Sequence, residues 1–370
     1  MRTIHQINLQ RHFGGGEVYT RFVCAALAEL GWRVVLYVSV DADFWSRLNV
    51  RAELAPVASL NEVAAKLPEN SVVMTHNVLN IHEARAWSAR YVLTGFLHMP
   101  LYDRDPAGLA SYRRLFGVSR HVLDSAQAKG LANAWPEPLY GVADLERGAT
   151  PGEIRKASEY DWDRRKLRDR TLGLLEPLAS SLRSAPPFSR RPGLTLGIVS
   201  RLTPIKQWPL LFRYLAPILA RHPQVNVEIF GSGGYASVRD LRRALAPLGD
   251  RARFWGQQQD MRGVYPLLDY VLSGLPEKEA LGLNLIEAQS CGTPVLAVNA
   301  PPFTETVLDG ASGYLYADPR TDQGQGFAVL LDRLLAGAPR PDPRLAAQHL
   351  EKFGAAAFQA RLAAALDGLA

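Results

Sequence analysis

The chain has 370 residues, 47% of them hydrophobic, and carries a formal net charge of +6 with a pI of about 9.3. At about 150 residues per domain, this length predicts two domains, each with enough apolar residues for a core. The composition excludes disordered and collagen-like chains, and the lack of an apolar run of about 18 residues excludes a membrane-spanning helix.

The cysteines and the first residues indicate the compartment. Cys24 and Cys291 are the only two cysteines, and both have apolar or small neighbours, which argues against the disulfide framework of a secreted protein. Met1 is followed directly by a strand pattern, so there is no space for the charged start and apolar core of a signal peptide. We therefore expect a cytoplasmic protein, with an anionic partner to match its basic charge.

Short β-branched runs alternate with amphipathic segments in the first half of the chain. The helical pattern of residues 18–30 follows the first of these runs. Alternation of this kind predicts βαβ units and a parallel sheet. The expected strands cover residues 4–9, 33–40, 72–75, 91–97 and 114–118.

The second half repeats this alternation, so the fold class is α/β with two doubly wound Rossmann-like domains that face a central cleft. We expect an N-terminal domain at 1–184, a linker at 185–193 rich in residues that halt regular structure, a C-terminal domain at 194–350 and a helix at 351–370 that packs back on the N-terminal domain. The expected strands are 194–199, 226–230, 253–255, 270–272, 295–298 and 314–316, and the expected helices are 208–220, 238–245 and 283–291.

One segment, residues 147–191, has no strand pattern and holds most of the net charge. Its eleven cations outnumber its six acids, and Tyr160 and Trp162 lie among them. We expect one or two exposed helices at 147–184, suited to contact with anionic lipid or with a phosphate-bearing acceptor. A solvated charged helix is the alternative. No basic face with interleaved aromatic residues is found elsewhere, so nucleic-acid binding is not expected.

Gly14, Gly15 and Gly16 lie between the first strand and the first helix. Glycines at such a turn let backbone N–H groups approach a phosphate, and the helix dipole favours its negative charge. The alternative is a tight turn without a ligand. A dinucleotide-binding loop is less consistent with the sequence, because Tyr19 stands where that motif needs its third glycine.

Arg201 and Lys206 follow the strand at 194–199 and precede the next helix. In parallel sheets, ligands bind beyond the carboxyl ends of the strands. At that place Arg would hold diphosphate oxygens with its planar guanidinium, and Lys would act as a point charge. Two unrelated surface cations are the alternative.

The segment from Glu279 to Glu287 is the most specific one in the sequence. Glu279 falls in a loop, and Glu287 falls on the helix that follows Gly282. One carboxylate could meet the sugar and the other the ribose of a bound nucleotide sugar, while the N–H groups at 281–283 open the helix toward phosphate or sugar oxygens. Two carboxylates on a solvated helix face are the alternative.

These motifs resemble, in their order along the chain, those of the retaining glycosyltransferases of family 4, which have the two-domain GT-B fold. The chief match is the Glu-x7-Glu unit of Glu279 and Glu287, followed by Gly-Thr-Pro-Val at 292–295. Other residues that match the family pattern are Gly14, Gly15, Gly16, His76, His98, Ser119, Arg201, Lys206, Gly231, Gly233, Gly256, Glu305, Asp309, Gly310 and Gly313. The chain departs from the pattern at Ala300-Pro301-Pro302, where two glycines are usual, at Leu281, where Phe is usual, and at Tyr140, where Asn is usual.

The resemblance implies transfer of a sugar from a nucleoside diphosphate sugar, UDP- or GDP-linked, to a glycan, glycolipid or other hydroxyl acceptor. It implies catalytic roles for His98, Arg201, Lys206 and Glu279 and acceptor contacts for His76, His98 and Tyr102. Donor contacts are implied for Gly14, Gly15, Gly16, Arg201, Lys206, Gly231, Gln257, Leu281, Gly282, Leu283 and Glu287.

The resemblance further implies a metal-independent, retaining hexosyltransferase without a cofactor, in which the leaving phosphate accepts the acceptor's proton. The Asp-x-Asp pairs at 41–43 and 161–163 lack the sequence context of metal-dependent transferases. We expect a role in bacterial envelope polysaccharide or lipopolysaccharide synthesis at the inner face of the membrane. A nucleotide-sugar 2-epimerase, a sugar phosphorylase and an inactive sugar-nucleotide-binding protein are the alternatives.

Overall fold

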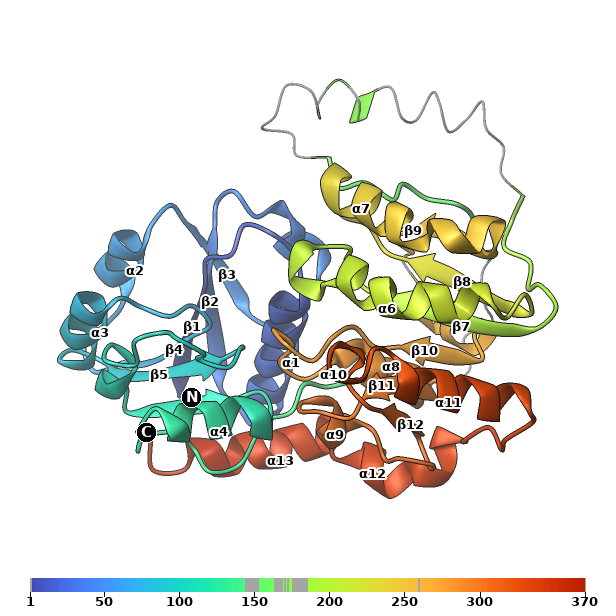
Figure 1. Ribbon diagram of the computed structural model, residues 1–370. Helices are drawn as coiled ribbons and strands as arrows, with labels where there is room; N and C mark the ends of the chain where they lie inside the picture. Colours follow the sequence, from blue (N-terminus) through green and yellow to red (C-terminus); the bar gives the residue numbers. More distant parts are fainter. Residues whose placement is uncertain are drawn as a thin grey trace. The chain divides into compact units, whose positions relative to one another are not determined.

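The computed structural model describes residues 2–143, 153–162, 169, 171, 173–174, 186–258 and 260–369. The chain folds as two compact units (Figure 1). Unit 1 comprises Met1–Asp144 and Glu351–Ala370, and unit 2 comprises Leu145–Leu350. The predicted pair of doubly wound α/β halves is confirmed, because each unit contains one parallel sheet.

Unit 1 is built on a six-stranded sheet in the order β3-β2-β1-β4-β5-β6. Helices connect its successive strands, as in βαβ units. The strands are β1 (Thr3–Asn8), β2 (Arg33–Ser39), β3 (Glu53–Val57), β4 (Val72–Thr75), β5 (Val92–Leu97) and β6 (Arg114–Gly117). The helices include α1 (Gly15–Glu29), α2 (Leu60–Lys66), α3 (Ile81–Ser88), α4 (Arg120–Ala128) and α13 (Ala355–Leu366).

Unit 2 contains a second six-stranded sheet, in the order β12-β11-β10-β7-β8-β9. Its strands are β7 (Leu194–Val199), β8 (Val225–Phe230), β9 (Ala252–Gly256), β10 (Tyr270–Leu272), β11 (Val295–Val298) and β12 (Gly313–Tyr316). Its helices include α6 (Trp208–Ala220), α7 (Tyr235–Leu245), α8 (Leu283–Ser290), α9 (Phe303–Thr306), α10 (Pro319–Asp322) and α11 (Gln325–Leu335), and α12 (Ala347–Glu351) leads out of the unit.

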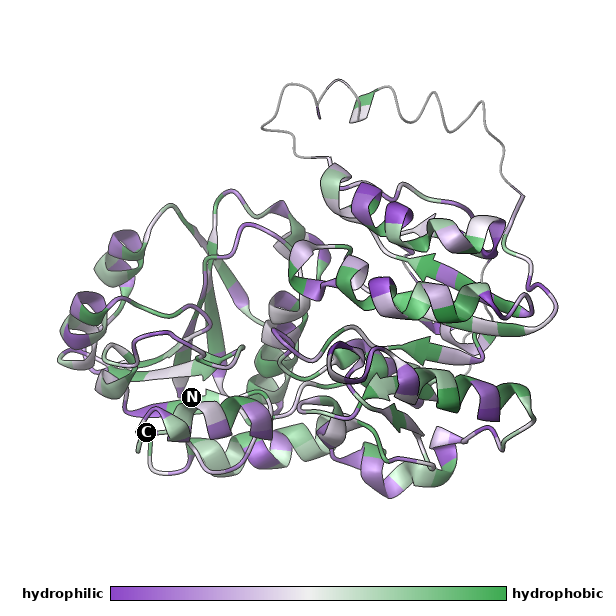
Figure 2. Cartoon of the chain, in the orientation of Figure 1, coloured by the Kyte–Doolittle hydropathy of each residue, from purple (hydrophilic) through white to green (hydrophobic). Residues whose placement is uncertain are grey.

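Apart from the edge strand β3, most strand residues of the two sheets are apolar and buried, as expected for parallel strands covered on both faces. All four residues of β4 and all six of β8 are buried. In Figure 2, where the ribbon is coloured by residue hydropathy, hydrophobic residues are frequent along the strands, and the helices carry hydrophobic and hydrophilic residues in alternation. The sequence pattern missed only β3 among these strands, because Pro56 interrupts it; β3 lies at the edge of its sheet, where a proline is tolerated.

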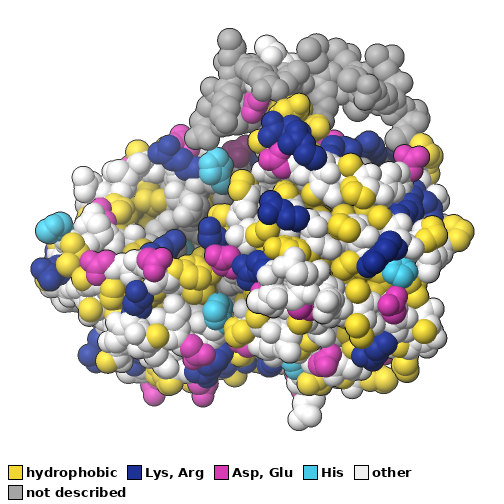
Figure 3. Space-filling view, in the orientation of Figure 1, with side chains coloured by type: hydrophobic (Ala, Val, Ile, Leu, Met, Phe, Trp, Pro, Cys, Tyr) yellow, Lys and Arg dark blue, Asp and Glu magenta, His cyan; other side chains and the backbone are white. Residues whose placement is uncertain are grey.

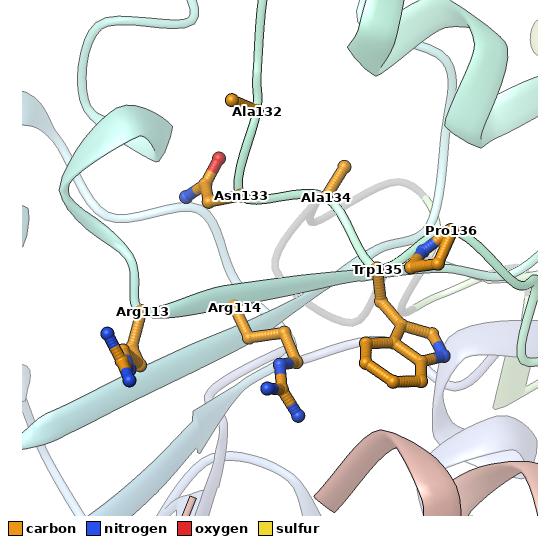
Figure 4. Close-up of a pocket in the computed structure, with 7 residues that line it drawn as sticks. All are labelled: Arg113, Arg114, Ala132, Asn133, Ala134, Trp135 and Pro136. Atoms are coloured by element: carbon orange, nitrogen blue, oxygen red, sulfur yellow. The ribbon is translucent and has the colours of Figure 1, made fainter. Parts of the chain in front are cut away.

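The C-terminal helix α13 packs on unit 1, against α1. The ring of Phe358 meets the ring of Tyr19 edge-on, at a centroid distance of 5.7 Å. Arg114 on β6 holds the end of α13, since its Nη1 donates to the carbonyl oxygens of Ala365 at 2.6 Å and Asp367 at 3.0 Å. The Arg114 side chain lies beside the Trp135 ring in a hollow at this edge of the sheet (Figure 4).

The division between the units lies earlier in the chain than the expected boundary at residue 184. The described residues 153–162 pack on unit 2: Ile154 belongs to its core, and Asp161 N donates to Gly233 O at 2.9 Å. Arg242 Nη2 donates to both carboxylate oxygens of Glu159. The expected helices at 147–184 lie largely outside the described residues.

The segment expected to be a linker is attached to unit 2 from residue 186 onward. Phe188 lies against the ring of Trp255, at a centroid distance of 5.1 Å. Arg191 pairs with Glu228 on β8 at 3.0 Å, and the Glu228 side chain is 1% exposed. Arg253 and the indole N–H of Trp255 also donate to Glu228. Three prolines and a glycine at 186–193 predicted an irregular segment, but they did not indicate which of the two cores the segment would cover.

Two surface properties bear on the expected partners. Among the described residues, the helices are all too short or too polar to cross a bilayer. On the face shown in Figure 3, Lys and Arg side chains are spread among acidic and apolar ones and do not form one field. In the basic segment, residues 147–191, the cations Arg155, Arg190 and Arg191 form ion pairs with carboxylates of the described residues.

Candidate active site

In unit 2 the order of the strands reverses between β7 and β10, and the turns after these two strands lie together. This is the place where doubly wound sheets bind ligands. Lys206 closes a short 3₁₀ turn after β7, Pro204–Lys206, and Glu279 lies in the loop after β10. Lys206 Nζ and Glu279 Oε2 are 2.5 Å apart, with side chains 26% and 16% exposed. The structure thus brings together a cation and a carboxylate that the sequence predicted separately.

The loop itself supports the Glu279 carboxylate. Oε1 accepts hydrogen bonds from the backbone N–H groups of Ala280 and Gly282, each at 3.2 Å. Burial by itself raises the pKa of this carboxyl group, but the charge and hydrogen bond of Lys206, together with the two N–H groups, outweigh burial and leave the pKa lowered. Glu279 is therefore a carboxylate at neutral pH.

Gly282 is the N-cap of α8 and has a left-handed backbone, with φ of 82° and ψ of 52°. The conformation suits glycine, and a Cβ here would lie 3.2 Å from the Phe303 ring. The N–H groups at 281–283 were expected to face phosphate or sugar oxygens. That expectation needs correction at Gly282, whose N–H donates to Glu279. The side chain of Leu281 is buried, and α8 begins at Leu283.

Glu287 lies on α8, one turn beyond its start, and is held by a neighbouring tyrosine. The hydroxyl of Tyr265, in the 3₁₀ turn Tyr265–Leu267, donates to Glu287 Oε2 at 2.7 Å. Burial raises the pKa of Glu287, and this hydrogen bond acts against the rise. Tyr265 is fully buried, so the carboxylate has a fixed orientation. Tyr265 was not among the predicted site residues, because its apolar neighbours in the sequence indicate only a core position.

The remaining predicted donor residues of unit 2 lie at the carboxyl ends of β7, β8 and β9. Arg201 is exposed just after β7 and forms no ion pair with a described carboxylate. Gly231, after β8, lies so close to the backbone after β7 that a Cβ there would be 1.9 Å from Ser200 O. The close approach therefore requires glycine. Gln257 is exposed after β9, and its Oε1 lies 3.3 Å from the Ser232 hydroxyl, which donates to Asp161 Oδ1 at 2.5 Å.

In unit 1 the glycines after β1 start a helix directly. Gly14 is the N-cap of α1, and Gly15 and Gly16 are its first two residues. A Cβ built at Gly16 meets no heavy atom within 4 Å, so neither crowding nor backbone conformation explains this glycine. There is therefore open space beside Gly16, in the turn where a phosphate was predicted.

His76 follows β4, and His98 follows β5. His76 Nδ1 and His98 Nε2 are 3.1 Å apart, and the two rings stack with centroids 5.3 Å apart. Burial lowers the pKa of His98 to about 4, and burial together with the nearby His98 holds the pKa of His76 well below its usual value. Both imidazoles are therefore neutral at neutral pH. Tyr102, the third predicted acceptor residue, is 39% exposed and has φ of 46°.

A buried polar layer behind these histidines was missed by the sequence analysis. His76 Nε2 is 2.8 Å from Gln6 Oε1, and Gln6 Nε2 donates to Cys24 Sγ at 3.3 Å. Asn8 Nδ2 donates to the Thr20 hydroxyl at 2.9 Å. The signal was present in the sequence, because Gln6 and Asn8 alternate with apolar residues on a strand where both faces should be apolar.

No group of three or more His, Cys, Asp or Glu side chains in the described part of the chain could hold a metal ion. Both carboxylates of the first Asp-x-Asp pair form ion pairs with arginines: Asp41 with Arg11 at 3.3 Å, and Asp43 with Arg47 at 3.1 Å. Asp163 of the second pair lies outside the described residues.

Comparison with known proteins agrees with these two units. The family of glycosyl transferases group 1 matches residues 188–342. A D-inositol 3-phosphate glycosyltransferase of Kribbella flavida is 32% identical over 390 aligned positions, which cover 92% of this chain and 87% of that protein. One of Stackebrandtia nassauensis is 34% identical over 170 positions, and that match spans 43% of this chain and only 37% of the relative.

Among solved structures, Anabaena HepE in complex with UDP and glucose superposes with a TM-score of 0.73 at 17% identity, over 100% of both chains. The fold of this chain is thus that of the GT-B glycosyltransferases, as the sequence predicted. The chain belongs to the glycosyl transferases group 1.

Proposed function

We propose that the protein is a retaining, metal-independent glycosyltransferase of family 4 that transfers a sugar from a nucleoside diphosphate sugar to a hydroxyl acceptor. The observation that carries this proposal is the arrangement at the switch point of unit 2. There Lys206, after β7, pairs with Glu279 in the loop after β10, and the helix that follows this loop carries Glu287, bound by Tyr265.

Charge determines the proposed role of each group in unit 2. Departure of the nucleoside diphosphate leaves negative charge on its phosphate oxygens, and fixed cations near those oxygens stabilise the transition state. Lys206 is held in place by Glu279, and the exposed Arg201 after β7 can reach a ligand. Glu287 would accept hydrogen bonds from ribose hydroxyls, which suits a carboxylate fixed by Tyr265.

Retention of configuration is proposed from the resemblance of the Glu-x7-Glu unit to family 4. The leaving phosphate would take the proton of the attacking hydroxyl on the same face of the sugar. His98 would contact a hydroxyl of the reacting sugar or of the acceptor. As a neutral imidazole it would act through hydrogen bonds and not through charge.

The donor is proposed to be UDP- or GDP-linked. The choice of UDP is supported by HepE, a protein of similar fold whose structure was solved in complex with UDP and glucose. The acceptor is proposed to be a glycan or glycolipid of the bacterial envelope. The names of the relatives add one acceptor of defined structure for the assay, D-inositol 3-phosphate.

Thermal denaturation with candidate donors tests donor binding. A ligand that binds only the folded state stabilises it by RT ln(1 + [L]/Kd), about 2.7 kcal/mol at a hundredfold excess over Kd. We expect a rise in melting temperature with UDP-glucose or GDP-mannose, and none with glucose alone. A melting temperature that stays at the value of the ligand-free protein with every UDP-, GDP-, ADP- and dTDP-sugar would contradict the proposal.

The fate of the donor separates transfer from the alternatives. Incubated alone, the donor should stay intact or be slowly hydrolysed, whereas a 2-epimerase would convert it to its epimer without an acceptor. With an acceptor, NMR of the product should show the anomeric configuration of the donor. Donor binding without turnover under any condition would indicate an inactive sugar-nucleotide-binding protein.

Contact with anionic membrane at the basic segment is part of the same proposal. Flotation with vesicles that contain phosphatidylglycerol should carry the wild type upward, and the variant Arg164→Ser/Arg165→Ser/Lys166→Ser should float less. Equal flotation of both proteins would show that these three cations do not bind the membrane and would favour a solvated charged segment.

A further inference from the structure

The first strand of unit 1 carries two polar residues on a face that should be apolar. Gln6 is fully buried and Asn8 is 1% exposed, and both side chains form hydrogen bonds with residues of α1. Their partners Thr20 and Cys24 are one turn apart on that helix. Burial of an amide side chain destabilises the folded state unless its hydrogen bonds are formed. A buried polar layer in a core is therefore expected to have a structural or functional role.

The hydrogen bonds of this layer have a fixed direction. The amide N–H of Gln6 donates to Cys24 Sγ at 3.3 Å, which turns its carbonyl oxygen toward His76. A carbonyl oxygen can only accept, and His76 Nε2 lies 2.8 Å from it. His76 Nε2 must therefore carry the proton, and His76 Nδ1 must be the acceptor.

Two groups lie within reach of His76 Nδ1: the Thr20 hydroxyl at 3.2 Å and His98 Nε2 at 3.1 Å. The hydroxyl proton of Thr20 is already used, because Thr20 donates to Gly16 O at 2.9 Å. His98 is left as the donor, so its Nε2 carries the proton and its Nδ1 does not. Each proton assignment follows from the one before it.

We propose that Gln6 is a positioning residue for His98: acting through His76, it fixes His98 as the Nε2–H tautomer and leaves Nδ1 of His98 as a hydrogen-bond acceptor. The tautomer itself does not depend on any reaction. Its catalytic meaning rests on the proposed function, in which His98 meets a hydroxyl of the reacting sugar or of the acceptor.

The Nε2–H tautomer of His98 limits the kind of hydrogen bond that its Nδ1 can form with a substrate. A ring with an unprotonated Nδ1 accepts a hydrogen bond from a substrate O–H and has no proton to donate to it. Burial keeps the pKa of His98 at about 4, so the lone pair persists at neutral pH. His98 would thus orient a hydroxyl, and would not act as a general acid.

The test reads the tautomers directly. In protein labelled with ¹⁵N at histidine, long-range ¹H–¹⁵N correlation spectra distinguish protonated from unprotonated ring nitrogens without any substrate. We expect protons on Nε2 and not on Nδ1 in both His76 and His98 of the wild type. In Gln6→Leu the acceptor for His76 Nε2–H is lost, and we expect both rings to show a mixture of tautomers.

Two variants control for structure. Gln6→Glu keeps an oxygen that accepts from His76 and should keep the proton on Nε2. His5, the preceding residue on β1, is also buried and lies near Tyr37 Oη at 3.5 Å. His5→Phe should therefore leave the spectra of His76 and His98 unchanged, although it disturbs the same strand.

Kinetics with UDP-glucose and D-inositol 3-phosphate give the second readout. In Gln6→Leu we expect kcat to fall roughly 10- to 100-fold, as for partners behind metal-binding histidines, while KM for the donor changes by less than about twofold. Gln6→Glu should recover most of the loss. Melting curves show whether each variant is folded.

A wild type with the proton on Nδ1 of either ring would overturn the proposal, and so would Gln6→Leu with the tautomers and kcat of the wild type. Failure of the proposed function is a separate result: a wild type without turnover and without donor binding contradicts that function, while the ¹⁵N spectra still decide the tautomer. The spectra alone test the proton assignment, and the kinetics alone test its use.

Discussion

The strand order of unit 1, read from β3 to β6, is the same as that of unit 2 read from β9 to β12. The turn after β1 therefore corresponds to the turn after β7, and the turn after β4 to the turn after β10. In unit 1 these turns carry the helix start at Gly14 and the neutral His76. In unit 2 they carry Lys206 and Glu279, which form an ion pair.

This difference shows that one topology supports two kinds of site. In unit 2, opposite charges stabilise each other at the switch point, and the lowered pKa of Glu279 is the result. In unit 1, burial lowers the pKa of both histidines, and hydrogen bonds replace charge. Unit 2 is thus suited to a charged diphosphate, and unit 1 to neutral hydroxyl groups.

Loss of Lys206 should have the largest effect. We expect Lys206→Ala to lower kcat roughly 100- to 1000-fold, the usual cost of removing one group that stabilises transition-state charge. Arg213→Ala removes an exposed cation from α6 of the same unit and should change kcat by less than about twofold. Turnover near that of the wild type in Lys206→Ala would show that the ion pair of unit 2 is structural only.

Glu287→Gln should weaken donor binding. The amide keeps an oxygen for the Tyr265 hydroxyl but has no charge for ribose hydroxyls, and a hydrogen bond to a charged group contributes about 1.5–3 kcal/mol. We therefore expect KM for the donor to rise by roughly 10- to 100-fold. Glu277→Gln changes a more exposed carboxylate, which pairs with Arg320, and serves as the control. An unchanged KM in Glu287→Gln would contradict the ribose assignment.

A pair of glycine variants compares the two units at their strand ends. Gly16→Ala places a methyl group in open space, so the free energy of unfolding should stay the same or rise by about 0.5–1 kcal/mol. Activity should still fall, by roughly tenfold, if a ligand approaches this helix start. Gly231→Ala should instead lose stability, by about 1–3 kcal/mol, because its Cβ would meet Ser200 O at 1.9 Å. Chemical denaturation and initial rates measure both.

The smallest expected effect is a shift in a pH profile. Tyr265→Phe removes the hydrogen bond that favours the Glu287 carboxylate, so the pKa of Glu287, already raised by burial, should rise further. Donor binding that needs the carboxylate is lost as pH falls through this pKa. The acid limb of kcat/KM for the donor should therefore move to higher pH. An unmoved limb would show that Glu287 is not the titrating group.

Periodicity was enough to predict most of the fold. Most strands of both sheets and the bounds of α6 follow from apolar spacing, because a buried parallel strand consists mainly of apolar residues. The edge strand β3 was missed at Pro56, and residues 153–162 were assigned to the wrong half. Ile154 packs in unit 2, and no local pattern shows which of two cores a single apolar residue will enter.

The sequence by itself determined the class of fold, the order of the motifs and the residues that carry charge, since these depend on composition and spacing along the chain. Only the tertiary structure decided which groups meet. It paired Lys206 with Glu279, oriented Glu287 with Tyr265 and aligned Gln6, His76 and His98. These residues belong to different strands, helices and turns, and contacts between them arise only when these elements pack together in each unit.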